Sequence, residues 1–256
     1  MKKKIIGVLG GMGPESTAIY YHALIQQCQK QYGAQHDQDY PEIFIYNLPI
    51  PNIVEGLEKP NETLAQLIKG AKKIDSIGVD FMVMPCNTAH YFYPGMAKSI
   101  SIPFICIFLA TAKKIKSKGY TKVGFLATET TVKYESYEKD FEKNNIKLIF
   151  PDQNDQKKLT KIIMNILAGD KLDADKETIK QIIERLKSKG AKAIVLACTD
   201  LPILFKQKDV DIEIFDTIEI LAEATVKYSI GKIGNEILEQ EKNSPAYFNK
   251  YKSDII

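Results

Sequence analysis

The sequence predicts an α/β fold of two similar lobes, each a mainly parallel sheet flanked by helices, with the site in the cleft between them. Segments 78–88 and 190–200 each begin with glycine, continue through an apolar run and reach a cysteine eight positions after the glycine. A weaker echo relates 6–10 to 123–127, where apolar runs again meet polar or glycine-rich turns. Short apolar runs alternate with longer amphipathic ones along the chain, which is typical of βαβ units.

The short apolar runs are too brief to span a membrane and are typical of buried parallel strands. Each of the two runs that end in cysteine is followed by small polar residues, as is usual where a strand leads into a helix. The predicted strands cover residues 4–9, 42–47, 80–85, 103–107, 122–127, 146–150, 192–197 and 212–215.

The amphipathic runs between these strands predict helices. Pro14 and Glu15 suit the first turn of a helix over 14–30. Segments 60–77 and 175–189 place apolar residues three and four apart on one face, and Gly190 is a suitable C-cap for the second. The predicted helices lie near residues 14–30, 60–77, 89–99, 109–118, 132–144, 155–168, 175–189 and 216–230.

The 256 residues are enough for two lobes of about 110 residues each. We predict a first lobe over 1–108, completed by 214–231, and a second lobe over 109–213. Residues 232–256 are polar and interrupted at Asn243-Ser-Pro245, which indicates a C-terminal tail.

Composition limits the classes of partner. The chain is 45% hydrophobic and 26% charged with a net charge of +3, and its lysines are scattered, which argues against a nucleic-acid partner. No apolar stretch has the length of a membrane span, so no membrane partner is expected. The N-terminus lacks the pattern of a signal peptide, which favours a cytoplasmic protein.

Four cysteines without a C-x-x-C pair argue against a metal site and against a disulfide framework. Cys28 and Cys106 are predicted to be structural. Cys86 and Cys198 each lie between a strand and a helix N-terminus, where the pKa of a thiol is expected to fall below about 8.5. Either cysteine alone could be a small buried hydrophobe, but packing does not require cysteine twice at the same sheet edge.

Two opposed thiols suit the inversion of a carbon stereocentre. One thiolate removes a proton from one face, and the opposite thiol delivers a proton to the other face. Strand-end amides and helix N-termini can stabilise the charge that develops on an adjacent carboxylate.

Several motifs together resemble the aspartate/glutamate racemase family, whose members work without pyridoxal phosphate. The resemblance runs in order over roughly residues 4–230, and the two cysteine blocks are its most specific part. The motifs are Gly10-Gly-Met-Gly-Pro14, Met84-Pro-Cys-Asn-Thr-Ala-His90, Leu126-Ala-Thr128, Gln156 and Ala197-Cys-Thr-Asp-Leu-Pro202.

The resemblance implies two pseudo-symmetric Rossmann-like lobes, an amino-acid substrate between them, no cofactor and a homodimer. It implies that Cys86 and Cys198 are the acid–base pair. It further implies substrate contacts, with the α-carboxylate held by Asn87, Thr88 and the backbone around the first glycine loop. The implied substrate-binding residues are Met12, Gly13, Asn52, Asn87, Thr88, Thr131 and Thr199.

The chain departs from the family pattern where an acidic side chain is recognised. The positions of a family arginine and a family lysine hold Ile53 and Leu167, and the usual Cys-Thr-Glu is Cys-Thr-Asp200. Arg185, the single arginine of the chain, lies on a predicted helix away from the strand ends. We therefore expect proton transfer at Cα to be kept, as in an aspartate racemase-like enzyme, while the sequence leaves open which amino acid is the substrate.

Two further side chains could tune the thiols. His90 follows Cys86 by four residues, about one helical turn, and could tune it or simply pack locally. Asp200 could orient groups near Cys198 or cap a helix. Gly11-Met-Gly13-Pro-Glu-Ser16 half matches a dinucleotide-binding fingerprint, but an anion at this helix start explains the glycines as well.

Two alternatives stay open beside an amino-acid racemase. A related thiol-dependent enzyme could isomerise or decarboxylate a small dicarboxylate, as a maleate isomerase-like protein does. A non-catalytic amino-acid-binding protein would also account for the missing arginine and lysine.

Overall fold

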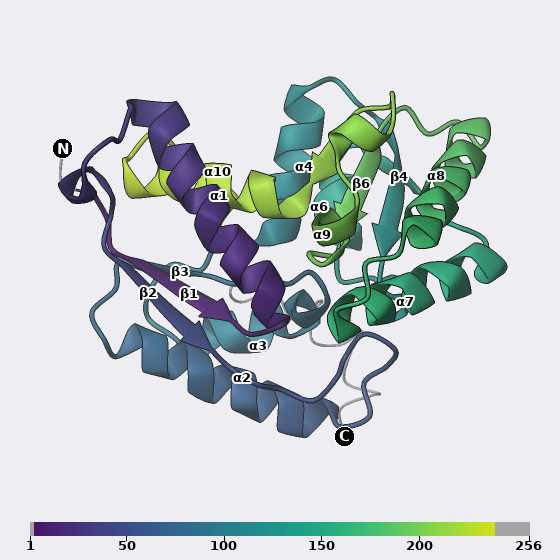
Figure 1. Ribbon diagram of the computed structural model, residues 1–256. Coiled ribbons are helices and arrows are strands. Elements are labelled where there is room, and N and C mark those ends of the chain that lie inside the picture. Colours follow the sequence, from purple (N-terminus) through teal and green to yellow (C-terminus); the bar gives the residue numbers. More distant parts are fainter. Residues whose placement is uncertain (1–2, 239–256) are drawn as a thin grey trace.

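The structure, a computed structural model, describes residues 3–238, and Figure 1 shows its arrangement. Within these residues two parallel sheets form the frame. The first has the order β2-β1-β3, with β1 at Ile6–Gly10, β2 at Ile43–Asn47 and β3 at Phe81–Val83. The second has the order β5-β4-β6-β7, with β4 at Lys122–Ala127, β5 at Lys147–Ile149, β6 at Ile194–Ala197 and β7 at Ile214–Asp216.

The two sheets repeat one topology. In each, the first strand in the chain is flanked by the second on one side and the third on the other. In the first sheet Ile6 pairs with both Ile43 and Phe81, and in the second Gly124 pairs with Ile194. The carboxyl ends of β3 and β6 are therefore equivalent, and Cys86 and Cys198 follow them.

Helices cover both faces of the sheets. Figure 1 shows α1 and α2 on opposite faces of the first sheet. Apart from short 3₁₀ turns, the helices are α1 (Pro14–Tyr32), α2 (Pro60–Asp75), α3 (Tyr93–Lys98), α4 (Ile107–Ser117), α5 (Glu129–Tyr134), α6 (Glu138–Lys143), α7 (Gln153–Ala168), α8 (Asp173–Ser188), α9 (Leu201–Leu204) and α10 (Thr217–Ser229). No helix of residues 3–238 combines the length and the apolar content that crossing a bilayer requires.

Three predicted elements differ from the structure. The strand predicted over 103–107 is reduced to one parallel bridge between Phe104 and Met82, because the chain turns into α4 at Ile107. The helix predicted over 132–144 is divided into α5 and α6 by Glu135, whose φ is 49°. The helix predicted over 89–99 begins as a 3₁₀ helix at Thr88–Phe92 and continues as α3.

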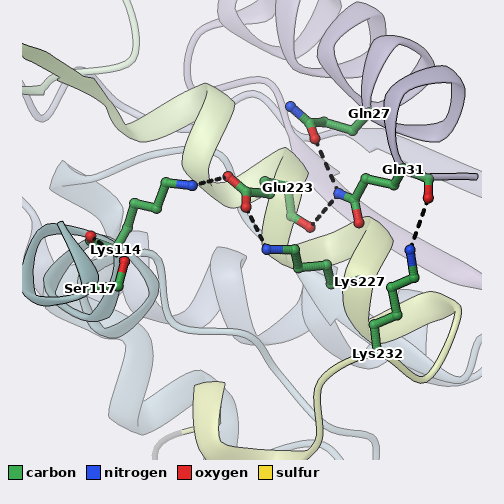
Figure 2. A network of polar contacts seen from close by, with 7 residues as sticks. All are labelled: Gln27, Gln31, Lys114, Ser117, Glu223, Lys227 and Lys232. Carbon is green, nitrogen blue, oxygen red and sulfur yellow. Dashed lines mark hydrogen bonds and ion pairs between the residues drawn. The ribbon is translucent and has the colours of Figure 1, made fainter.

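Helix α10 contacts both α1 and α4. Figure 2 shows the polar part of this junction, in which Glu223 of α10 binds two ammonium groups, Lys114 Nζ at 2.6 Å and Lys227 Nζ at 2.5 Å. The side chain of Gln31 donates to the carbonyl oxygen of Glu223 at 3.1 Å. These contacts join elements that lie far apart in the sequence.

The predicted lobe limits at 108–109 and 213–214 stay a prediction, since α10 packs against α1 of the first half of the chain and also contacts β6 and β7 of the second. Of the predicted tail, 232–238 include a 3₁₀ turn at Asn235–Ile237, and Ile237 is buried. Leu238 forms an antiparallel bridge with Ile105. Residues 239–256 lie outside the described residues.

Candidate active site

A cavity of about 180 Å³ lies where the loops after β1, β2, β3, β4 and β6 converge. This volume is below the roughly 300–1,000 Å³ of sites for drug-sized ligands, so the cavity suits a small molecule. Its lining comes from both halves of the chain and consists of Gly11, Met12, Gly13, Pro14, Ile50, Pro51, Asn52, Ile53, Val54, Cys86, Asn87, Thr88, Thr128, Leu167, Cys198, Thr199 and Asp200.

Cys86 and Cys198 both line this cavity, one from each sheet. Both are free thiols, and they are 6% and 4% exposed. The backbone N–H of Ala89 donates to Cys86 Sγ at 3.4 Å. The fold therefore brings Cys86 and Cys198 to one cavity, as predicted. Cys28 and Cys106 do not line this cavity.

The prediction of a low pKa for the two thiols was wrong. The pKa of Cys86 is raised to about 12, mainly by burial and in smaller part by the nearby Asp200 carboxylate, while the N–H of Ala89 opposes the shift. Burial likewise raises the pKa of Cys198 well above its ordinary value, and Asp200 adds to that rise. Donors at a helix start lower a thiol pKa only where burial does not outweigh them.

Asp200 is the carboxylate beside the second thiol. Cys198 Sγ donates to Asp200 Oδ2 at 3.7 Å, and Ser16 Oγ of α1 donates to Asp200 Oδ1. Burial raises the pKa of Asp200, an effect that the Ser16 hydrogen bond opposes. Ser16 also contacts the carbonyl oxygen of Thr199 at 2.9 Å and so holds the two halves together at the cavity.

Asn87 lines the cavity and carries a buried acceptor. The hydroxyl of Thr217 donates to the carbonyl of Leu196 at 2.9 Å, so its oxygen accepts from Asn87 Nδ2, also at 2.9 Å. This arrangement fixes which way the amide faces. Asn87 is 1% exposed, and its Oδ1 has no hydrogen-bond partner. A buried acceptor of this kind favours a ligand group that donates.

Three threonine hydroxyls meet at the boundary between the two sheets. Thr128 Oγ1 lies 3.0 Å from Thr88 Oγ1 and 2.9 Å from Thr131 Oγ1, and it caps α5 by accepting from the N–H of Thr131. Thr88 and Thr128 line the cavity, but Thr131 lies behind them. Thr131 is thus positioned to hold the other two hydroxyls.

The glycine loop after β1 carries Met12 and Gly13 to the start of α1, a helix of 19 residues. Gly11 has a φ of 99°, and a Cβ there would come within 2.5 Å of the Leu48 carbonyl oxygen, so only glycine fits. The loop therefore places the backbone N–H groups of a helix N-terminus at the cavity, where they favour an anion.

Five apolar residues of the lining come from the loop after β2 and from α7, and we call them together the apolar wall. It consists of Ile50, Pro51, Ile53, Val54 and Leu167. The loop after β2 reaches the second half of the chain, since Val54 belongs to that core and its carbonyl accepts from Thr130 Oγ1 at 3.1 Å. Asn52, beside it, uses Oδ1 to accept from the Val54 N–H at 3.0 Å and Nδ2 to reach Glu55 at 3.3 Å.

Comparison with known proteins agrees with this architecture. A sequence model of the Asp/Glu/Hydantoin racemase family matches residues 9–225. The chain belongs to this family. It is therefore a racemase, an enzyme of the isomerase class.

Individual relatives span most of the racemase. It is 34% identical over 222 residues to the broad-specificity amino-acid racemase RacX of Bacillus subtilis, covering 87% of this chain and 96% of that protein. The aspartate racemase of Picrophilus torridus is 30% identical, with a TM-score of 0.75 over 91% of this chain and 97% of that one. An aspartate racemase homologue from Pyrococcus horikoshii is also 30% identical, with a TM-score of 0.74 over 90% and 100%.

His90 does not line the cavity of the racemase and contacts the backbone of Cys86 instead of its thiol. The N–H of Ile107, at the start of α4, donates to His90 Nε2 at 3.2 Å, so the proton of the ring is on Nδ1. Nδ1 then donates to the carbonyl oxygen of Cys86 at 2.6 Å. Burial lowers the pKa of His90 to about 4. The neutral ring therefore links the backbone of Cys86 to the start of α4 through its two hydrogen bonds.

Sequence reasoning did not select three residues that the fold brings to the site. Ser16 gives no signal beyond a serine in the first turn of a helix, and Val54 is one apolar residue among many. Thr128 had a usable signal, because it follows β4 as Gly11 follows β1 and therefore ends an equivalent strand.

Proposed function

We propose that this racemase acts on amino acids without a cofactor, and that Cys86 and Cys198 are its two acid–base groups. The observation that carries the proposal is that equivalent strand ends of two similar sheets bring both thiols to one small cavity. Such a pair can address opposite faces of one carbon. The relatives named as amino-acid and aspartate racemases support an amino-acid substrate.

In this mechanism one sulfur, as thiolate, takes the Cα proton and becomes a thiol. The electron pair left on Cα delocalises into the α-carboxylate, and the opposite thiol donates its proton to the other face and becomes a thiolate. The net change is inversion, with the roles of the two sulfurs exchanged. The reverse reaction uses the same groups in the opposite order.

The raised pKa values mean that both thiols are protonated in the empty cavity near neutral pH. The α-ammonium group of a bound amino acid brings a positive charge, which favours ionisation of a nearby thiol. We propose that Asp200 tunes Cys198 in this step, because its Oδ2 accepts from that thiol at 3.7 Å.

The polar groups of the cavity suggest how the amino acid is held. Asn87 Oδ1 is an acceptor without a partner in the described residues and suits the α-ammonium group, an alternative to the carboxylate-binding role predicted for this side chain. The N-terminus of α1 at Met12 and Gly13, together with Thr88, suits the α-carboxylate. Thr199 contributes to the same lining, while Thr131 acts through Thr88 and Thr128.

The first test follows deuterium at Cα. The racemase is incubated in deuterium oxide with each L-amino acid, and loss of the Cα–H signal is followed by NMR together with the appearance of the D-enantiomer. We expect at least one amino acid to gain deuterium and invert. Binding without deuterium incorporation for every amino acid would reject the proposal, and release of carbon dioxide from a small dicarboxylate would favour a decarboxylase.

We also propose a homodimer formed through the edge strand β2. Within residues 3–238 no strand pairs with the outer edge of β2, and β2 exposes apolar side chains, with Phe44 38% and Ile45 42% exposed. Tyr21 of α1, beside Ile45 in one groove, is 43% exposed. A free strand edge is complementary to another strand, and a two-fold axis pairs β2 with its own copy.

Light scattering after size-exclusion chromatography tests the dimer. We expect twice the chain mass for the unchanged protein and one chain mass for Ile45→Lys, because a buried ammonium group opposes the contact. Ile77→Lys, at a 44% exposed position away from β2, is the matched control and should stay dimeric. A monomeric unchanged protein, or a dimeric Ile45→Lys, would contradict this interface.

A cytoplasmic location is part of the same proposal. None of the four cysteines forms a disulfide, which is the usual state in a reducing compartment.

A further inference from the structure

We propose that the substrates of this site are neutral amino acids with an aliphatic side chain. This inference rests on the proposed racemase function and adds to it the class of side chain that the cavity takes. It is carried by the charges of the lining, by the apolar wall and by the hydrogen bonds that already occupy the polar groups near that wall.

The lining contains no positive charge. Among the described residues that line the cavity, Asp200 is the only one that carries a formal charge. A substrate with an acidic side chain would bring a second carboxylate into this space without a counter-charge, which is costly in a buried site. Arg185 cannot supply one, because its guanidinium binds both oxygens of Asp155, at 2.5 and 2.8 Å.

The apolar wall offers contacts that suit methyl and methylene groups. Ile53 and Val54 are only 6% and 8% exposed, so their side chains are held in place by the two cores. Leu167 closes the wall from α7, and a Cβ built on Gly13 would lie 3.3 Å from Leu167 Cδ2 and 3.5 Å from Asp200 Oδ1. The space near Gly13 is therefore narrow, with an apolar group on one side and the carboxylate on the other.

The acceptors near this wall already accept hydrogen bonds, which makes them less available to a cationic side chain. The oxygens of Asp200 already accept from Ser16 and Cys198, and the carbonyl of the Asn52 side chain accepts from the Val54 N–H. The unpartnered Oδ1 of Asn87 lies next to the first thiol in the chain, where the α-ammonium group is required. A cavity of about 180 Å³ also limits the length of the side chain.

The experiment compares kcat/KM for racemisation of alanine, valine, leucine and methionine with that of aspartate, glutamate, lysine and arginine. We expect the best aliphatic substrate to exceed every charged one by about 100-fold or more, the range in which an unpaired charge or polar group in a site discriminates. Faster turnover of an acidic or a basic amino acid than of every aliphatic one would overturn the inference.

Two variants test whether the wall is the cause. Leu167→Lys adds an ammonium group at a position that is 41% exposed and therefore tolerant of the change, and Ile53→Arg adds a guanidinium at the buried part of the wall. We expect each to raise kcat/KM for aspartate or glutamate by about tenfold or more and to lower it for leucine. If Ile53→Arg does not fold, Leu167→Lys still tests the role of the apolar wall. Ile77→Lys is the control for a charge that is added outside the cavity.

The outcomes separate this inference from the proposed function. An active racemase that prefers charged substrates rejects the aliphatic class, and a Leu167→Lys variant with an unchanged preference rejects the apolar wall as the cause of that preference. Both outcomes leave the two-thiol mechanism standing. Absence of inversion and of Cα deuterium for all amino acids rejects the mechanism itself.

Discussion

Replacing Cys86 or Cys198 by serine is expected to lower the rate of racemisation by at least about 100-fold, the lower range for loss of a general acid or base. Serine keeps the size of the side chain, but its hydroxyl is too weak an acid to share the proton at neutral pH. The rate is measured by separating the enantiomers chromatographically, starting from each pure enantiomer.

Deuterium exchange distinguishes lost chemistry from lost folding. With one sulfur removed, the other can still take a proton from the face that it addresses and return a deuteron to the same face. We expect Cys86→Ser and Cys198→Ser to exchange Cα–H without inversion, each for the opposite enantiomer. Cys28→Ser and Cys106→Ser are matched controls, because neither residue lines the cavity, and both should keep the rate of racemisation. Full turnover in either cavity variant would reject the two-base mechanism.

The repeated pattern explains why the fold and the meeting of the thiols could be predicted. A glycine, an apolar run and a cysteine at equal spacing describe one strand and its carboxyl end, and parallel strands bring such ends to one edge. The two sheets have the same strand order, so Cys86 after β3 and Cys198 after β6 occupy equivalent places. Local patterns and topology were sufficient for this step.

The environment of these residues could not be predicted in the same way. The sequence favoured a lowered thiol pKa from the nearby helix starts, but burial depends on what other segments cover the site. Residues 50–54 cross to the second half of the chain, and this crossing forms the apolar wall. The i, i+4 spacing of His90 pointed to the thiol of Cys86, but the intervening segment forms a 3₁₀ helix, which rotates the ring to the carbonyl.

Acid is expected to destabilise the protein through His90. The pKa of this buried ring is about 4, whereas its ordinary value is 6.5, so the unfolded chain binds the proton more readily. The stability that the neutral ring contributes is therefore complete above pH 6.5 and is lost as the pH falls toward 4. The difference in pKa corresponds to about 3 kcal/mol in the free energy of unfolding.

The physical cause of this loss is burial of the ring, which disfavours its charged form, while the hydrogen bond to the carbonyl oxygen of Cys86 opposes the shift in pKa. Nε2 accepts from the N–H of Ile107, so a proton on Nε2 would set two donors against each other inside the core. Urea unfolding above pH 6.5 and near pH 4 measures the free energy of unfolding at each pH. His90→Asn should lower this free energy at both pH values, and it should remove the part of the pH dependence that the His90 ring contributes. His22→Asn, at an exposed position of α1, is the matched control for the substitution itself. Equal pH dependence in the unchanged protein and in His90→Asn would show that the ring is not the group that titrates.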